Sequence, residues 1–139
     1  MSIDKIHIDW QSGMAFDVEV NGHKMVVDAY PEVGGMDKGP RPKTLMLVAL
    51  AGCTGMDVVS ILKKMRVDLE GLRIWVEGEL TKEHPKHYSS MKVIYEFKGK
   101  NLPMDKLEKA VKLSEENYCG VSAVYRKAMP LSTEIRVVE

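Results

Sequence analysis

Two cysteines, Cys53 and Cys119, have the most scope for chemistry in this chain of 139 residues. They lie 66 residues apart, and two thiols are too few for a disulfide-stapled scaffold or for a cysteine-rich zinc site on their own. Both could be small buried apolar residues, as free cysteines often are. Alternatively, one is a nucleophilic thiolate and the other a resolving thiol, a pair that cycles through sulfenate and disulfide without a cofactor. The residues alone leave both interpretations open.

Asp57 follows Cys53 by one helical turn, so the two side chains share a helix face. An unpaired carboxylate there would raise the pKa of the thiol and slow its attack on a substrate. Asp57 could instead orient a cation, or pair with a lysine of another element. An Asp at the edge of a buried helix is most often simply paired or solvated.

Other polar motifs lack the partner residues that their chemistry needs. His84 and His87 fall in an expected hairpin turn, and a metal site needs three or four ligands. Ser60 and Ser122 have no convincing His and Asp partners for a hydrolase triad. The sequence therefore predicts no metal and no resident cofactor.

Composition places the chain among single-domain globular proteins. It is 45% hydrophobic and 29% charged, with 20 basic residues balanced by 20 acidic ones. Because the charges balance, the chain lacks the excess of basic residues that is typical of nucleic-acid-binding proteins. No signal peptide is recognisable, because Asp4 and Lys5 interrupt any apolar run near the start. The stretch 45–62 is apolar enough to be considered as a membrane span, but Asp57 and Ser60 argue against it. We expect a cytoplasmic protein that binds neither membrane nor nucleic acid.

The elements that must position the thiols follow from the hydrophobic pattern. Residues 1–30 read as β-strands with a hairpin at Asn21-Gly22, and residues 43–66 as a long helix that carries Cys53. Residues 72–139 contain two strands, an amphipathic helix over 104–118 that ends next to Cys119, one or two further helical turns and a closing strand. Ser114 lies on the apolar stripe of that helix. Strands and helices are partly segregated, which predicts an α+β fold in one domain over 1–139.

The helix over 43–66 also predicts an oligomer. Its first part, residues 45–56, carries no charge on any face, and a helix that is apolar all round is buried all round. The whole predicted helix is about 33 Å long, and a domain of this size has too little mass to surround it alone. We therefore expect a second copy of the chain to help cover it.

Two segments of the sequence resemble the OsmC/Ohr family, the osmotically inducible and organic hydroperoxide resistance proteins. Residues 45–64 (LMLVALAGCTGMDVVSILKK) resemble the family's cysteine helix, and residues 107–122 (LEKAVKLSEENYCGVS) its second-cysteine segment. The resemblance covers residues 13–139. It implies an intertwined homodimer in which antiparallel-rich sheets wrap around two central cysteine helices.

The resemblance also implies an activity, which is reduction of organic hydroperoxides. Cys53 matches the peroxidatic residue, which becomes a sulfenic acid, and Cys119 matches the resolving residue, which condenses with it to a disulfide. An external dithiol reductant then restores the pair. The alternative is a stress-associated binding or structural dimer of the same fold that lacks efficient peroxidase activity.

The sequence departs from the family pattern at the groups that activate the thiol. Active members use an arginine from the N-terminal strands, held by a glutamate ten residues before the peroxidatic cysteine. Residues 1–40 contain no arginine, and the glutamate position is occupied by Lys43. Cations that could substitute are Arg41, Lys43 and Arg126, with Asp57 as a possible orienting group.

Overall fold

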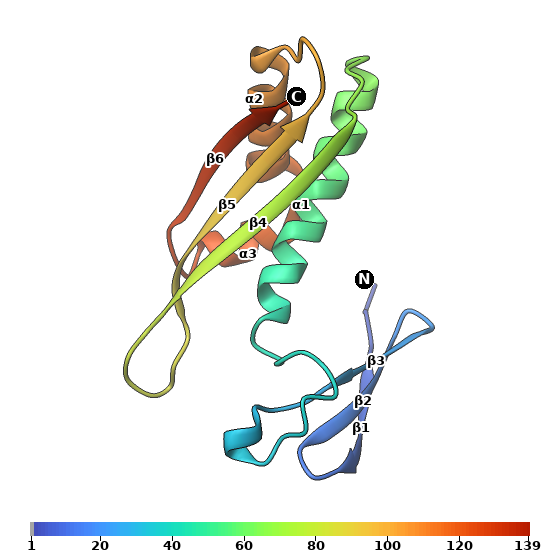
Figure 1. The fold of residues 1–139 in the computed structure, drawn as a ribbon, viewed down its shortest axis with the longest axis vertical. Coiled ribbons are helices and arrows are strands. Elements are labelled where there is room, and N and C mark those ends of the chain that lie inside the picture. Colours follow the sequence, from blue (N-terminus) through green and yellow to red (C-terminus); the bar gives the residue numbers. More distant parts are fainter. Residues whose placement is uncertain (1) are drawn as a thin grey trace. The chain divides into compact units, whose positions relative to one another are not determined.

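The computed structural model describes residues 2–139, and it contains six strands and three α-helices (Figure 1). These confirm the expected α+β class and the expected order of elements. Their bounds are β1 His7–Ser12, β2 Ala15–Val20, β3 His23–Val27, α1 Leu45–Lys64, β4 Gly71–Leu80, β5 Tyr88–Lys98, α2 Met104–Leu113, α3 Gly120–Arg126 and β6 Leu131–Val138.

The chain divides into two compact units. The first ends at Met46, and the second runs from Leu47 to Glu139. The first unit is an antiparallel meander in the order β1–β2–β3. Its β2–β3 turn is built from Asn21 and Gly22, both with positive φ, as the hairpin motif predicts.

The second unit is a three-stranded sheet in the order β4–β5–β6, and α1, α2 and α3 lie behind it in Figure 1. Alternate residues of β5 face the helices and form the centre of the core with apolar residues of α1 and α2. The fully buried members of this core include Leu50, Leu62, Tyr95, Phe97 and Leu107.

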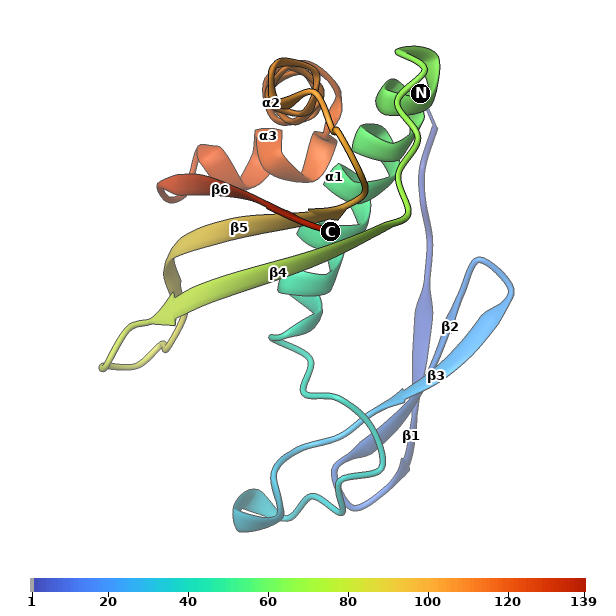
Figure 2. The same cartoon turned by 45° about the horizontal axis from the view of Figure 1, so that its top comes forward.

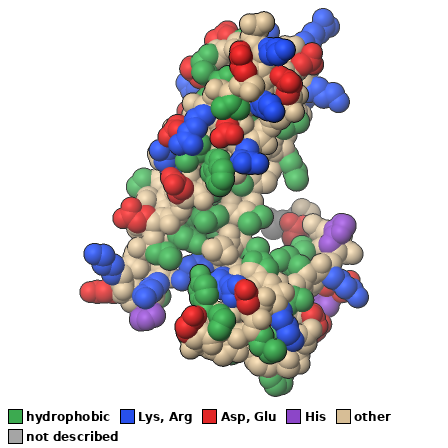
Figure 3. Space-filling model, in the orientation of Figure 1, with side chains coloured by type: hydrophobic (Ala, Val, Ile, Leu, Met, Phe, Trp, Pro, Cys, Tyr) green, Lys and Arg blue, Asp and Glu red, His purple; other side chains and the backbone are tan. Residues whose placement is uncertain are grey.

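The opposite face of this sheet carries charged groups. Lys92 Nζ lies 2.8 Å from Glu134 Oε1, and the Arg73 guanidinium lies 5.7 Å from the centre of the Trp75 ring. Figure 3 shows basic and acidic side chains spread over this part of the molecule. The sheet therefore has one face for the core and one for solvent.

β6 pairs with β5 in parallel, while β4 pairs with β5 antiparallel. A parallel neighbour needs a long crossover, and α2 and α3 supply it, as Figure 2 shows. The same crossover carries Cys119 past α1. Cys119 thus lies on the connection that the topology of the sheet requires.

The single chain does not bury α1 all round, as we expect of a helix that one domain has too little mass to surround. Only Leu50, Thr54, Val58 and Leu62 of this helix are buried. Val48 and Met56, on another side of the helix, are 62% and 77% exposed. α1 is also long and apolar enough to cross a membrane by length and composition alone. The chain buries one stripe of the helix and leaves a second apolar stripe uncovered.

Two helix predictions need correction. The cysteine helix begins at Leu45, two residues later than expected, because residues 42–44 form a turn in which the Leu45 N–H donates to the Pro42 carbonyl at 3.1 Å. The helix expected over 104–118 is α-helical only as far as Leu113. Residues Ser114–Tyr118 form a π-helical turn, which changes the direction of the side chains just before Cys119.

Candidate functional site

Cys53 lies in the middle of α1, where Leu, Ala and Met residues favour the helix. It is half-buried and packs against the main core. The next residue, Thr54, is fully buried, and its hydroxyl donates to the Leu50 carbonyl at 3.0 Å. Because the Thr54 hydroxyl is already hydrogen-bonded, the Cys53 sulfur is the remaining reactive group of this helical turn.

Cys119 lies between the π-helical turn and α3, and only 3% of it is exposed. Its backbone N–H donates to the Ser114 carbonyl at 2.7 Å, which closes the π-helical turn. Its sulfur accepts a hydrogen bond from the backbone N–H of Ser122 at 3.3 Å, so Cys119 is the N-cap of α3. Both contacts hold the sulfur in a defined position.

The fold brings the two cysteines together with Asp57. The sulfurs of Cys53 and Cys119 and a carboxylate oxygen of Asp57 all lie within 4.8 Å of one another. Both thiols are free. A disulfide needs a sulfur–sulfur distance of about 2.05 Å, so the two sulfurs must move closer together before they can bond. The closeness of the two thiols is a finding of the structure, since their separation along the chain is no measure of their distance in space.

Asp57 is partnered by Ser114, a residue that the sequence interpretation missed. The Ser114 hydroxyl, which is fully buried, donates to Asp57 Oδ2 at 2.9 Å. This bond ties the start of the π-helical turn to α1, one helical turn from Cys53. The only available sequence signal was the spacing of Ser114, on the apolar stripe of the helix over 104–118.

A second hydrogen-bond network anchors the π-helical turn to the sheet. Glu115 accepts from the Tyr95 hydroxyl at 3.2 Å and from the Thr133 hydroxyl at 2.7 Å. Burial first, and then the nearby Glu115 carboxylate, raise the pKa of Tyr95 far above its usual range, so the phenol stays protonated as a donor. The π-helical turn that precedes Cys119 is therefore hydrogen-bonded both to Asp57 of α1 and to β5 and β6.

The surroundings of Cys53 disfavour its thiolate. Burial raises the pKa of the Cys53 thiol, and the neighbouring Cys119 and the Asp57 carboxylate raise it further. The backbone N–H of Val121 acts in the opposite direction. In the unit that holds Cys53, no lysine or arginine is among the principal groups that shift this pKa.

The three proposed substitute cations lie in different places. Arg41 belongs to the first unit, where its guanidinium donates to the Ala29 carbonyl, pairs with Asp37 and lies over the Tyr30 ring. Lys43 is exposed in the turn before α1. Arg126 is exposed at the end of α3. Within residues 47–139, the structure brings Asp57 to the thiols and shows no ion pair of Arg126.

A hollow of about 540 Å³ adjoins the thiol pair through Asp57. It lies between α1 and the α2–π-turn segment, and apolar side chains supply much of its wall. The lining residues are Asp57, Ser60, Ile61, Lys64, Met65, Leu113 and Tyr118. Neither cysteine is among these lining residues, so the hollow meets the cysteine cluster at Asp57.

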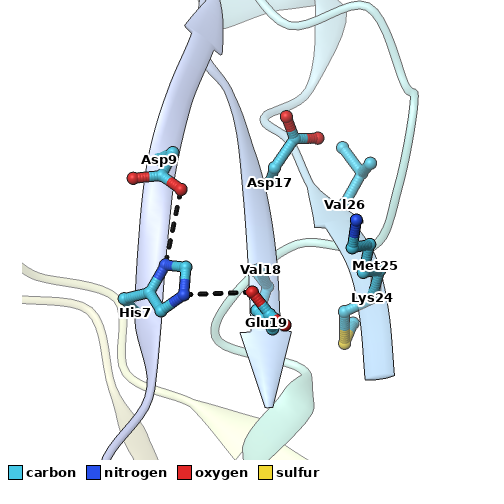
Figure 4. Close-up of a pocket in the computed structure, with 8 residues that line it drawn as sticks. All are labelled: His7, Asp9, Asp17, Val18, Glu19, Lys24, Met25 and Val26. Atoms are coloured by element: carbon cyan, nitrogen blue, oxygen red, sulfur yellow. Dashed lines mark ion pairs between the residues drawn. The ribbon is translucent and has the colours of Figure 1, made fainter. Parts of the chain in front are cut away.

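Histidines elsewhere do not assemble a comparable site. On β1, His7 lies 3.4 Å from Asp9 and 3.1 Å from Glu19 of β2, beside an open hollow of about 420 Å³ (Figure 4). These side chains are about half exposed or more, as expected for a polar sheet face. His87 turns its Nδ1 to the Pro85 carbonyl at 2.7 Å, within its own loop.

Comparison with known proteins identifies the family to which this fold belongs. The family model described as OsmC-like protein matches residues 35–134. The chain therefore belongs to the OsmC-like family, which confirms the resemblance noted from the two cysteine segments.

Individual relatives and solved structures agree. The chain is 31% identical to protein YhfA of Escherichia coli K12 over 132 residues, which cover 94% of this chain and 96% of that protein. A hypothetical protein from Aquifex aeolicus VF5 superposes with a TM-score of 0.87 at 30% identity, covering 99% of this chain and 98% of the other. An organic hydroperoxide resistance protein OsmC from Legionella pneumophila superposes with a TM-score of 0.69 at 17% identity, covering 98% and 99%, and shows the fold alone.

Proposed function

We propose that this protein reduces organic hydroperoxides with its two thiols. Cys53 attacks the terminal peroxide oxygen, releases the alcohol and becomes a sulfenic acid. Cys119 then attacks the Cys53 sulfur, which forms the disulfide and releases water. An external dithiol reduces the disulfide and closes the cycle. The observation that carries the proposal is the placement of both sulfurs within 4.8 Å of each other in an OsmC-like chain.

The assignment of roles rests on exposure. Cys53 is half-buried, whereas Cys119 is 3% exposed and held by the Ser122 N–H. The more accessible thiol, Cys53, reacts with the substrate first. The enclosed thiol, Cys119, then reacts with the sulfenic acid formed on Cys53. The hollow beside Asp57 is suited to an apolar organic group more than to hydrogen peroxide, since Ile61, Met65 and Leu113 line it.

Activation of Cys53 requires a cation, because burial and Asp57 raise the pKa of its thiol. We propose that Arg41, Lys43 or Arg126 supplies it, from the same chain or from a partner chain. Asp57 would then orient the incoming cation. Replacing the responsible residue with glutamine should lower the peroxide rate at least about tenfold. Arg136→Gln, on the solvent face of β6, serves as the matched control and should leave the rate unchanged.

The working unit in this proposal is a homodimer, and residues 1–139 form one functional domain in it. The exposed stripe of α1 that includes Val48 and Met56 supports this, because apolar side chains that the chain leaves uncovered need another partner. Since glutathione and thioredoxin keep thiols reduced in the cytoplasm, we also propose that the protein works there.

A second function is favoured by the same raised pKa of Cys53. If no cation approaches the thiol, the protein would be a stress-associated binding or structural dimer of the OsmC fold without efficient peroxidase activity. In that case the Cys53–Cys119 pair would oxidise slowly, and the hollow beside Asp57 would serve for binding only.

The products of stoichiometric oxidation test the assigned roles of the cysteines, and the rate of that oxidation distinguishes the two functions. One equivalent of cumene hydroperoxide added to reduced protein should consume both thiols and yield a Cys53–Cys119 disulfide within one chain, identified by peptide mapping. Cys119→Ser should stop at a sulfenic acid on Cys53 that a dimedone reagent traps. Cys53→Ser should leave Cys119 reduced. Oxidation of Cys119 at an unchanged rate in Cys53→Ser would refute the assigned roles.

A further inference from the structure

The cluster of Cys53, Asp57 and Cys119 also has the composition of a metal site. Each of these three side chains, all within residues 2–139, offers one ligand atom, and the three atoms lie within 4.8 Å of one another. We propose that the reduced protein binds one Zn²⁺ ion through the two sulfurs and the Asp57 carboxylate. The proposal does not depend on peroxidase activity, since it concerns the dithiol state alone.

The donor set matches the preferences of zinc. Thiolate sulfur binds Zn²⁺ at about 2.3 Å and carboxylate oxygen at about 2.0–2.2 Å, in tetrahedral geometry. Ligand atoms around such an ion are roughly 3.3–3.8 Å apart, so a cluster within 4.8 Å needs only side-chain adjustment. Three protein ligands leave a fourth position for water, the pattern of catalytic rather than structural zinc sites.

The outer contacts needed for such a site are already present. Ser114 donates to Asp57 Oδ2 at 2.9 Å, which fixes the carboxylate and leaves its other oxygen for the ion. The Ser122 N–H donates to the Cys119 sulfur, and the Val121 N–H donates to the Cys53 sulfur. Hydrogen bonds of this kind stabilise thiolate ligands.

Charge and proton balance set the conditions for binding. Two thiols and one carboxylate bind Zn²⁺ with release of two protons, which gives a site with net charge −1. Zinc binding is therefore stronger at higher pH. The disulfide offers no thiolate, so zinc and the Cys53–Cys119 disulfide exclude each other. Oxidation by a peroxide or a disulfide reagent would release the ion.

Cobalt substitution tests the site directly. Titration of the reduced full-length protein with Co²⁺ under anaerobic conditions should give a thiolate-to-cobalt charge-transfer band that saturates at one ion per chain. Added Zn²⁺ should displace the cobalt and abolish the band. Cys53→Ser and Cys119→Ser should each weaken zinc binding at least about 100-fold, measured against a chromophoric chelator, and Asp57→Asn at least about tenfold.

Controls separate this site from adventitious binding. His7→Ala, which removes the His7–Asp9–Glu19 cluster of the first unit, should leave zinc affinity unchanged. Protein oxidised to the disulfide should show no charge-transfer band, and reduction should restore it. The proposal is overturned if the band is absent in reduced protein, survives Cys119→Ser, or saturates at one ion per two chains.

Discussion

At the scale of residues, the reactivity of Cys53 is set first by its burial and then by three neighbours with opposed effects. Cys119 and the Asp57 carboxylate disfavour a charge on the sulfur, and the Val121 N–H favours it. Burial adds to the unfavourable side and is the largest influence. A thiol with a raised pKa holds less thiolate at neutral pH than free cysteine does, so its reactivity should keep rising with pH where that of free cysteine levels off.

Asp57→Asn tests this balance. The substitution removes the negative charge and keeps an oxygen that can accept from Ser114. The pKa of Cys53 should fall, and the rate of its alkylation by iodoacetamide at pH 7 should rise about two- to tenfold. The measurement is the pH profile of alkylation in a Cys119→Ser background, where Cys53 is the only thiol. An unchanged profile would mean that Asp57 does not act on the sulfur.

At the scale of elements, the π-helical turn Ser114–Tyr118 decides where Cys119 lies. Ser114 fastens it to α1 and Glu115 fastens it to β5 and β6. Nothing in the residue pattern distinguishes this turn from a continuation of α2, because the two differ only in whether backbone N–H groups donate five or four residues back. The sequence predicted the helix and its apolar stripe, but it could not predict the partners of Ser114 or Glu115.

Two buried serines provide a matched pair for this element. Ser114→Ala leaves Asp57 without its hydroxyl donor and should lower the free energy of unfolding by about 1–2 kcal/mol. Ser122→Ala should be neutral or stabilising, because its hydroxyl is buried without a hydrogen-bond partner among the described residues. Urea denaturation of both variants measures the difference. Equal losses would show that Ser114 is not a structural link.

The loop between β3 and α1 is organised by one carboxylate. Asp28 accepts hydrogen bonds from the N–H groups of Ala29, Met36 and Lys38 at 2.8, 3.1 and 3.2 Å. Burial alone would raise its pKa, but these donors and Arg41 outweigh burial and hold the pKa below its ordinary value.

Acid should therefore loosen this loop. A lowered pKa means that Asp28 contributes its full stabilisation above about pH 4, and loses it as pH falls through the folded-state pKa. The protection factors of the Met36 and Lys38 amides against hydrogen exchange should fall below that range, and in Asp28→Asn they should already be low at neutral pH. Unchanged protection of both amides in the variant would contradict this account.

At the scale of the whole molecule, α1 connects the site to the proposed dimer. The uncharged run of 45–56 was enough to predict that this helix needs covering, yet the chain itself covers only one stripe of it. The family resemblance assigned paired roles to Cys53 and Cys119, but their closeness was not predicted, since the 66 residues between them carry no local signal of contact. The parallel pairing of β5 with β6 was likewise not predicted, because it depends on a crossover that local patterns do not describe.

Met56→Asp tests the dimer. Met56 is 77% exposed in the single chain, so a charge there should change monomer stability by no more than about 0.5 kcal/mol. In a dimer built on α1 it would be buried, and association should weaken at least about 100-fold. Sedimentation equilibrium measures the change, with Lys63→Asp at the exposed end of α1 as the control. A wild-type protein that is monomeric at micromolar concentration would contradict the proposed assembly.

The central claim is that the thiol pair is a peroxidase, and the rate of the first chemical step tests it most directly. Stopped-flow mixing of reduced protein with cumene hydroperoxide at pH 7 gives the second-order rate constant of Cys53 oxidation. We expect a constant at least about 100-fold above that of free cysteine at the same pH, lost in Cys53→Ser and kept in Cys119→Ser. A constant no greater than that of free cysteine would contradict the peroxidase assignment.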